Sequence, residues 1–324
     1  MSVRVVITGG AGFLGTLLAE RLLANPLAVG GADPADVGEL VLVDLAAPRD
    51  ELAVDGRVRA VVGDLEEVLA DLPDADVVCH LAGVVSGAAE ADFDLGMRTN
   101  VDGTRAVLEY ARRQAAPPVL AFASSLAVFG ADPAIGPVDV VDDDTLPRPQ
   151  SSYGIQKFIG EQLVADYARK GFVRGRSVRL MTVSVRPGKP NAAASSFLSG
   201  IIREPLAGER APCPVPAGTP VALSSPGRTL DGIVRAVSVD DATWGSRTAM
   251  NLPALTTTPR EMAAALDRVA GSGTSDLIEW TEDPTIAAIV ASWPARFETA
   301  RAARLGLTAD QTFDDIVREY LAGT

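Results

Sequence analysis

The most informative segment for the fold is Thr8-Gly9-Gly10-Ala11-Gly12-Phe13-Leu14-Gly15. It follows Val3–Thr8, a run typical of a buried strand, and it precedes leucines at helical spacing. Gly9, Gly12 and Gly15 let the backbone turn tightly, approach a pyrophosphate and pack the helix on the strand. The first turn of that helix offers free N–H groups and a positive dipole end to phosphates. The stretch therefore predicts a strand–loop–helix unit that binds a dinucleotide.

Short apolar runs alternate with helical patterns up to about residue 186. The runs are nearly continuous in Val and Leu, which favours strands buried on both faces. The predicted strands are Val3–Thr8, Glu39–Val43, Val58–Val62, Asp76–Leu81, Val119–Ala123 and Ser177–Val185. Strand–helix alternation predicts the α/β class, with a Rossmann-type doubly wound parallel sheet and right-handed crossovers.

The pattern changes after Arg186, where prolines break the chain into short elements. We predict that residues 1–186 form the dinucleotide-binding domain, with a return segment near 225–250. Residues 187–324 then form mainly a smaller, C-terminal substrate-binding lobe that closes over the carboxyl edge of the sheet. The helices predicted there are Ser195–Arg203, Thr229–Val237 and one that begins at a Thr258 capping box and runs through Val269.

Composition excludes several classes of protein. The 324 residues carry 29 basic and 42 acidic side chains, a net charge of −13 that repels nucleic-acid backbones. Two cysteines and one histidine, Cys79, Cys213 and His80, are too few for a disulfide framework or a convincing zinc site, so no metal is expected. No apolar stretch is long enough to cross a membrane, and the first residues lack the pattern of a signal peptide. We expect a cytoplasmic protein that binds neither nucleic acid nor membrane.

Two acidic residues follow predicted strands. Asp44 ends the second strand, where a carboxylate accepts hydrogen bonds from the adenosine ribose and repels a 2′-phosphate, which favours NAD over NADP. It lies 29 residues after Gly15, more than the usual ~20, because the 25–38 loop intervenes. Asp64 ends the third strand and either contacts the adenine amine or caps the next helix.

Tyr153 and Lys157 are four residues apart and share one face of a predicted helix. A nearby ammonium favours the phenolate and lowers the tyrosine pKa, so the pair is a candidate general acid/base. Ser124 and Ser125 end the fifth strand, at the sheet edge where ligands bind. A hydroxyl there can hydrogen-bond a reacting hydroxyl or carbonyl.

Together these motifs resemble the extended short-chain dehydrogenase/reductase family, over the whole chain and in the family's order. The matching segments are Thr8–Gly15, Gly63-Asp64-Leu65, His80-Leu81-Ala82-Gly83, Asn100 within 99–104, Ser124–Gly130, and Tyr153 with Lys157.

The resemblance implies NAD as cofactor and a role for each motif. Tyr153 is the implied acid/base, Lys157 contacts the nicotinamide ribose, and Ser125, counted back from Gly130, polarises the substrate oxygen. Asn100 would hold a water for proton relay, and His80 is a structural position. The implied cofactor-binding residues are Gly9, Gly12, Phe13, Leu14, Gly15, Asp44, Asp64, Leu65, Leu81, Ala82, Gly83, Asn100, Tyr153 and Lys157. A homodimer is one assembly that the family suggests.

Three segments, at 84–94, 186–197 and 225–229, are similar to a narrower group whose members oxidise a four-carbon sugar acid with NAD. We therefore expect oxidation of a small sugar acid at its C2 hydroxyl to the 2-oxo acid. Ser86, Asn191 and Arg228 would join Ser125 and Tyr153 as substrate-binding residues. Arg228 would hold the carboxylate, because arginine pairs with it bidentately, and Lys189 is next in line.

Two other functions stay open at this point. A nucleotide-sugar epimerase or dehydratase would use the same Tyr153 but keep its NAD bound through turnover. Phe129 departs from the tyrosine usual there in sugar-nucleotide members, which weakens that interpretation slightly. A non-catalytic dinucleotide sensor would bind partners instead, although such proteins often lose the tyrosine or the lysine that this chain retains.

Overall fold

The computed structural model describes residues 2–188 and 193–323. Its largest sheet has seven strands in the order β11-β7-β5-β4-β1-β2-β3, and every pairing within it is parallel. The strands are β1 (Val3–Thr8), β2 (Val37–Asp44), β3 (Val58–Val62), β4 (Val77–His80), β5 (Val119–Ser125), β7 (Arg174–Leu180) and β11 (Met250–Asn251). This order, which runs outward in both directions from β1, confirms the doubly wound Rossmann-type sheet.

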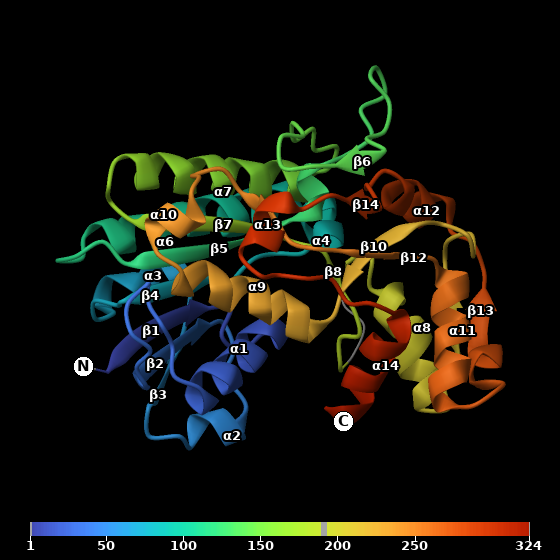
Figure 1. Cartoon of the computed structure of the whole chain (residues 1–324), viewed down its shortest axis with the longest axis horizontal. Coiled ribbons are helices and arrows are strands. Elements are labelled where there is room, and N and C mark those ends of the chain that lie inside the picture. Colours follow the sequence, from blue (N-terminus) through green and yellow to red (C-terminus); the bar gives the residue numbers. More distant parts are fainter. Residues whose placement is uncertain (1, 189–192, 324) are drawn as a thin grey trace.

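Both faces of this sheet are covered by helices (Figure 1). Successive side chains of a strand point to opposite faces, so Val5 and Ile7 of β1 pack with one layer of helices and Val6 packs with the other. The first layer contains α1 (Phe13–Ala24), α9 (Pro226–Ser238), α10 (Asp241–Trp244) and α13 (Ala300–Arg304). The second layer contains α3 (Leu65–Val68), α6 (Gly103–Arg112) and α7 (Ser152–Arg169).

The predicted strand Ser177–Val185 is wrong, because it joins two separate strands. β7 pairs with β5 only as far as Leu180 opposite Ser125, where β5 ends and the chain turns into a short 3-10 helix. With no partner beyond that point, the chain leaves the sheet, and β8 (Thr182–Val183) pairs with β10 (Val221–Ser224) instead. The chain thus crosses into the second lobe at Met181.

The second lobe has its own apolar core, built around Ile201, Leu266 and Ile316. Figure 1 shows its helices α8, α11 and α14 side by side, away from the large sheet. Thr258 caps α11 by accepting a hydrogen bond from the Glu261 backbone, but the Glu261 carboxylate accepts from the Thr257 hydroxyl, so only half of the predicted capping box forms. The lobe consists of α8 (Phe197–Leu206), β9 (Ala211–Cys213), β12 (Leu255–Thr257), α11 (Pro259–Ala270), β13 (Ile278–Trp280), α12 (Pro284–Ala291) and α14 (Phe313–Ala322), with β8 and β10.

The remaining elements are short and border the carboxyl edge of the large sheet or lie on the surface. They are α2 (Asp50–Ala53), α4 (Ser86–Ala91), α5 (Phe93–Gly96), a π-helix at Met97–Asp102, β6 (Val140–Val141), β14 (Arg296–Phe297) and 3-10 turns at Leu69–Asp71, Leu126–Val128 and Thr274–Leu277. Among residues 2–188 and 193–323, no helix has the length and apolar content needed to cross a membrane.

Candidate active site

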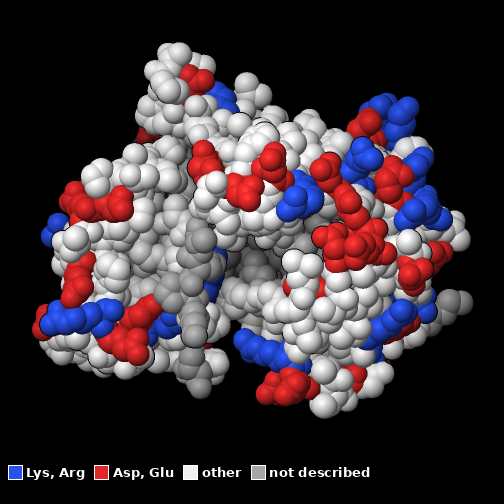
Figure 2. Space-filling view, turned by 180° about the vertical axis from the view of Figure 1, so that it is seen from behind, with Lys and Arg blue, Asp and Glu red and all other residues white. Residues whose placement is uncertain are grey.

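A cavity of about 720 Å³ lies where the carboxyl edge of the large sheet meets the second lobe. The face in Figure 2 is hollowed between the two halves of the molecule, and acidic side chains are spread over the surface around it. Every residue predicted above to bind the cofactor lines this cavity except Asn100. The parallel sheet accounts for this convergence, since the segments that follow its strands all emerge at one edge.

The glycine loop leaves the backbone open to a ligand. Gly9 has φ +73°, and a Cβ on it would stand 2.7 Å from the Ala82 nitrogen. A Cβ on Gly15 would overlap the Gly9 carbonyl oxygen. Gly12 immediately precedes α1 and provides no side-chain cap, so the first N–H groups of this helix are free for a phosphate. The loop therefore fits the pyrophosphate of a dinucleotide.

Asp44 and Asp64 stand at the ends of β2 and β3 and line the same cavity. The Asp44 carboxylate accepts hydrogen bonds from the backbone of Ala11 at 3.0 Å and of Leu45 at 2.7 Å, which ties it to the glycine loop. Asp64 accepts from the Glu66 backbone at 3.0 Å and caps α3. Capping α3 is compatible with contact to the adenine amine, because Asp64 also lines the cavity.

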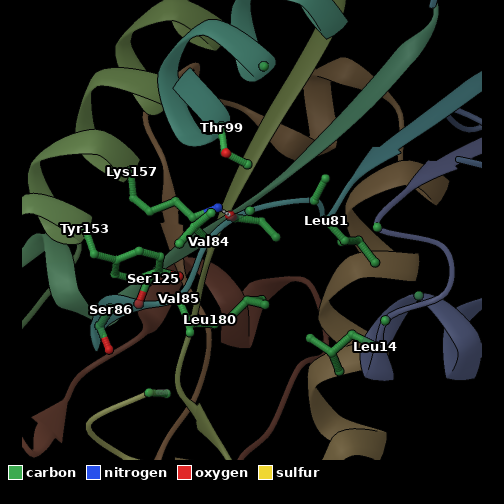
Figure 3. A pocket seen from close by; sticks show the side chains of 18 of the residues that line it. Leu14, Leu81, Val84, Val85, Ser86, Thr99, Ser125, Tyr153, Lys157 and Leu180 are labelled. Carbon is green, nitrogen blue, oxygen red and sulfur yellow. Dashed lines mark hydrogen bonds between the residues drawn. The ribbon is translucent and has the colours of Figure 1, made fainter. Parts of the chain in front are cut away.

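Tyr153, Ser125 and Lys157 meet on the other side of the cavity (Figure 3). Tyr153 and Ser125 line the same part of the cavity, and the Lys157 ammonium lies 5.8 Å from the centre of the tyrosine ring. Lys157 is buried and donates to the Ala123 carbonyl at 2.9 Å. Ser124, by contrast, donates to buried Glu161 at 2.5 Å, so Ser125 is the serine that faces Tyr153.

Burial changes the electrostatics expected for this pair. It raises the pKa of Tyr153 above the ordinary 10.0, outweighing the Ser125 hydrogen bond and the charge of Arg186, which both lower it. The expectation of a lowered tyrosine pKa is wrong for the protein without cofactor. Burial also lowers the pKa of Lys157 to about 8, so this lysine holds its charge weakly. Desolvation disfavours the charged forms of both Tyr153 and Lys157. The spacing of the two residues in the sequence does not reveal how deeply they are buried.

Asn100 lies behind the cavity wall, inside the π-helix. Its amide nitrogen donates to the Val84 carbonyl at 3.1 Å and to Gln156 at 2.8 Å, and its oxygen accepts from the Val84 backbone at 2.9 Å. A Cβ on Gly83 would stand 2.9 Å from that oxygen and 3.3 Å from the Lys157 nitrogen, so the oxygen is near Lys157. Asn100 therefore fixes the segment after β4, and its water-holding role stays a prediction.

The structure separates the predicted substrate residues. Ser86 lines the cavity beside Ser125, whereas Arg228 does not line it and instead lies 3.5 Å from Asp231 on the surface of α9. Asn191 and Lys189 fall outside the described residues. The second lobe contributes Arg186, Ser195 and Trp293 to the lining, and sequence reasoning assigned no role to them.

A pattern in the sequence does indicate Arg186 as a candidate site residue. It is a basic residue a few positions after a buried strand that ends at the carboxyl edge, inside the distinctive 186–197 segment. Trp293 had none, because it reaches the cavity from a loop near the C-terminus.

The chain matches the family described as "NAD dependent epimerase/dehydratase family" over residues 5–228. It is 48% identical over 323 residues to D-erythronate dehydrogenase from Cupriavidus necator, covering 98% of each chain. It is 39% identical over 325 residues to D-erythronate dehydrogenase from Haemophilus influenzae, covering 98% of this chain and 99% of that one.

Among solved structures, a nucleoside-diphosphate-sugar epimerase from Agrobacterium tumefaciens superimposes with a TM-score of 0.87 and 36% identity, covering 100% of this chain and 96% of the other. L-threonine 3-dehydrogenase from Trypanosoma brucei, at 23% identity, shares the fold with a TM-score of 0.83, covering 100% of this chain and 97% of its own. The two sequence relatives and the two solved structures each match at least 98% of this chain. The protein is an NAD-dependent dehydrogenase and belongs to the NAD-dependent epimerase/dehydratase family, the extended short-chain dehydrogenases/reductases.

Proposed function

We propose that the protein oxidises D-erythronate, or a sugar acid of that type, at the C2 hydroxyl to the 2-oxo acid. The observation that carries the proposal is the meeting of Tyr153 and Ser125 in the cavity that also holds the glycine loop. The names of the two relatives at 48% and 39% identity support the choice of substrate.

Tyr153 is the general base in this proposal. Its phenolate takes the proton of the C2 hydroxyl while Ser125 donates a hydrogen bond to the same oxygen, so two groups hold that oxygen as the carbonyl forms. When bound, NAD⁺ supplies the acceptor for the C2 hydride, so the products are the 2-oxo acid, NADH and a proton. Lys157 would orient the nicotinamide ribose and stabilise the phenolate.

The cavity also supports the choice of cofactor. The glycine loop and the start of α1 would hold the pyrophosphate, and Asp44 would accept hydrogen bonds from the adenosine ribose. The Asp44 carboxylate already accepts three backbone hydrogen bonds, from Ala11, Leu45 and Ala46, so it is held in position at the end of β2. A 2′-phosphate beside this carboxylate would be repelled, which supports NAD over NADP.

A screen of four- to six-carbon aldonic acids with NAD, followed by NADH absorbance, tests the proposal. D-erythronate is expected to produce NADH continuously, and the product is expected to be a 2-oxo acid by mass spectrometry and carbonyl derivatisation. Absence of NADH with every acid, or an oxo group at another carbon, would contradict it.

The alternative that the sequence left open, a nucleotide-sugar epimerase, is tested in parallel. The Agrobacterium tumefaciens structure at 36% identity carries that name. An epimerase would keep its cofactor bound and return the hydride, so no NADH would accumulate in solution. Incubation with UDP- and GDP-sugars, analysed by chromatography for an epimer, distinguishes the two.

A further inference from the structure

We propose that Arg186 forms the subsite for the substrate carboxylate and thereby directs the reaction to the hydroxyl next to it. Arg186 lines the cavity with Tyr153, Ser125 and Ser86. The inference rests on the proposed function for the identity of the acid, and on the cavity for the place where the acid binds.

Two hydrogen bonds of the backbone and one of the side chain hold Arg186 in position. Its backbone N–H donates to the Ser199 hydroxyl at 3.0 Å, and its carbonyl accepts from Arg203 at 2.7 Å. Its own Nε donates to the Val183 carbonyl at 3.1 Å. Ser199 and Arg203 are one turn apart on α8, so one helix anchors both ends of the Arg186 peptide unit. Arg186 therefore loses little conformational entropy when it binds a carboxylate.

The guanidinium of Arg186 lacks an anionic partner within the part of the chain that the structure describes. Among the described residues no carboxylate forms an ion pair with it, and of its guanidinium nitrogens only Nε makes a hydrogen bond, to the Val183 carbonyl. It is half-buried, and burial lowers its pKa while Tyr153 acts in the opposite direction. A desolvated guanidinium without a counter-ion is costly, and its fork of N–H groups matches a carboxylate.

The chemistry of a 2-hydroxy acid requires a cation close to Tyr153. Its carboxyl carbon is bonded directly to the carbon that carries the reacting hydroxyl, so the two groups must be held side by side. Arg186 meets this requirement, because it lines the same cavity as Tyr153 and Ser125. A carboxylate held there presents the C2 hydroxyl, rather than the C3 or C4 hydroxyl, to Tyr153 and Ser125.

The other cations of the described lining fit this role less well. Lys157 is buried and already donates to the Ala123 carbonyl. Arg98 is exposed on the π-helix. Arg228, outside the cavity, is near Asp231.

Calorimetric titration of the NADH-loaded enzyme tests the inference without turnover. D-erythronate is titrated beside erythritol, which has the same carbon chain with a hydroxymethyl group in place of the carboxylate. Arg186→Gln is expected to weaken D-erythronate binding by about 30-fold or more, as for removal of one partner of a buried charge pair. Erythritol and NADH binding are expected to stay unchanged. Arg186→Lys should be intermediate, because it keeps the charge and loses the fork.

Arg247→Gln is the matched control, since it removes one exposed arginine that does not line the cavity. The inference is overturned if Arg186→Gln binds D-erythronate as the parent does, if Arg228→Gln carries the loss instead, or if erythritol or NADH binding falls equally. Oxidation of D-erythronate by an unimpaired Arg186→Gln enzyme would overturn this inference alone. If the parent enzyme oxidises no sugar acid, the proposed function fails, and the same titration with glycolate tests Arg186 separately. Weaker glycolate binding in the Arg186 variants alone supports the carboxylate subsite. Equal glycolate affinities in the parent and the variants overturn it.

Discussion

Burial and two neighbours act in opposite directions on the hydroxyl of Tyr153. Burial raises its pKa, whereas the Ser125 hydrogen bond and the positive charge of Arg186 lower it. The phenolate is the form that accepts a proton, so oxidation is expected to accelerate as pH rises toward the pKa of this tyrosine. The balance between the three effects decides where on the pH scale this occurs.

Tyr153→Phe removes only the phenolic oxygen. Turnover with the sugar acid is expected to fall by about 10²–10⁴-fold, the usual contribution of general acid–base catalysis, and the rise of the rate with pH should disappear. NAD affinity should stay near that of the parent, because the ring remains. Steady-state rates across pH and a fluorescence titration of NADH check both. Turnover near the parent rate would exclude Tyr153 as the base.

His80 is the single histidine of the chain and is fully enclosed. Its Nδ1 lies 2.6 Å from the Thr8 hydroxyl, and its Nε2 lies 3.0 Å from Thr104. The Thr104 hydroxyl donates to the Asn100 carbonyl at 2.7 Å, so it accepts from Nε2–H, and Nδ1 accepts from Thr8. This arrangement holds a neutral imidazole between β1, β4 and α6.

Burial, with a smaller effect of Lys157, lowers the pKa of His80 from 6.5 to about 3. Its imidazole NMR signals are therefore expected to stay constant between pH 5 and 8 in the folded enzyme. Because the folded pKa is the lower one, the contribution of His80 to stability is present above pH 6.5 and is lost as pH falls toward about 3. A titration of the signal near neutral pH would contradict this assignment.

Helix α7 is joined to the sheet by a buried ion pair one turn beyond Lys157. Arg179 of β7 donates to both carboxylate oxygens of Glu161 at 2.8 Å, and Ser124 donates to one of them at 2.5 Å. This contact fixes the helix that presents Tyr153 and Lys157 to the cavity.

Glu161→Ala leaves the Arg179 guanidinium buried without its partner. The free energy of unfolding is expected to fall by about 3–5 kcal/mol in denaturant titrations. Asp166→Ala, on the same helix, removes the exposed pair with Arg169 and should cost less than about 1 kcal/mol. Equal losses for the two variants would show that the buried pair does not join helix and sheet as described.

Asp44, at the end of β2, is the residue that we propose selects NAD over NADP. Asp44→Ala is expected to relax the preference for NAD, because the charge that repels a 2′-phosphate is removed. NAD binding should also weaken, since Asp44 holds the Ala11 backbone of the glycine loop. The ratio of kcat/KM for NAD and NADP measures the change. Comparable use of both cofactors by the parent enzyme would refute the role of Asp44.

At the scale of the whole molecule, the large sheet depends on distant segments. α9 covers one of its faces with Leu230, Ile233 and Val237, and β11 pairs with the edge strand β7. Both lie after the chain has crossed into the second lobe.

A fragment of residues 1–186 is therefore expected not to fold cooperatively, because it would expose the face of the sheet that α9 covers. Circular dichroism during thermal unfolding and dye binding to exposed apolar surface are the measurements, with the full chain as control. A cooperative transition close to that of the full chain would show that the first 186 residues form an independent domain.

Local patterns in the sequence determined the parts of the protein that depend on near neighbours. The strands Val3–Thr8 and Val58–Val62 begin and end as predicted, and the glycine loop lies between a strand and a helix as its spacing indicates. Tyr153 and Lys157 share a helix face because four residues are about one turn. These features follow from chain geometry over a few residues.

Which charged groups meet in the cavity depends on how the chain packs in three dimensions. Arg186 and Arg228 are both basic residues in segments that distinguish this chain, yet only Arg186 lines the cavity with Tyr153. The end of β7 at Leu180 depends on where β5 ends, and the raised pKa of Tyr153 depends on burial. Desolvation and contacts between distant segments are properties of the packed chain, so sequence spacing does not contain them.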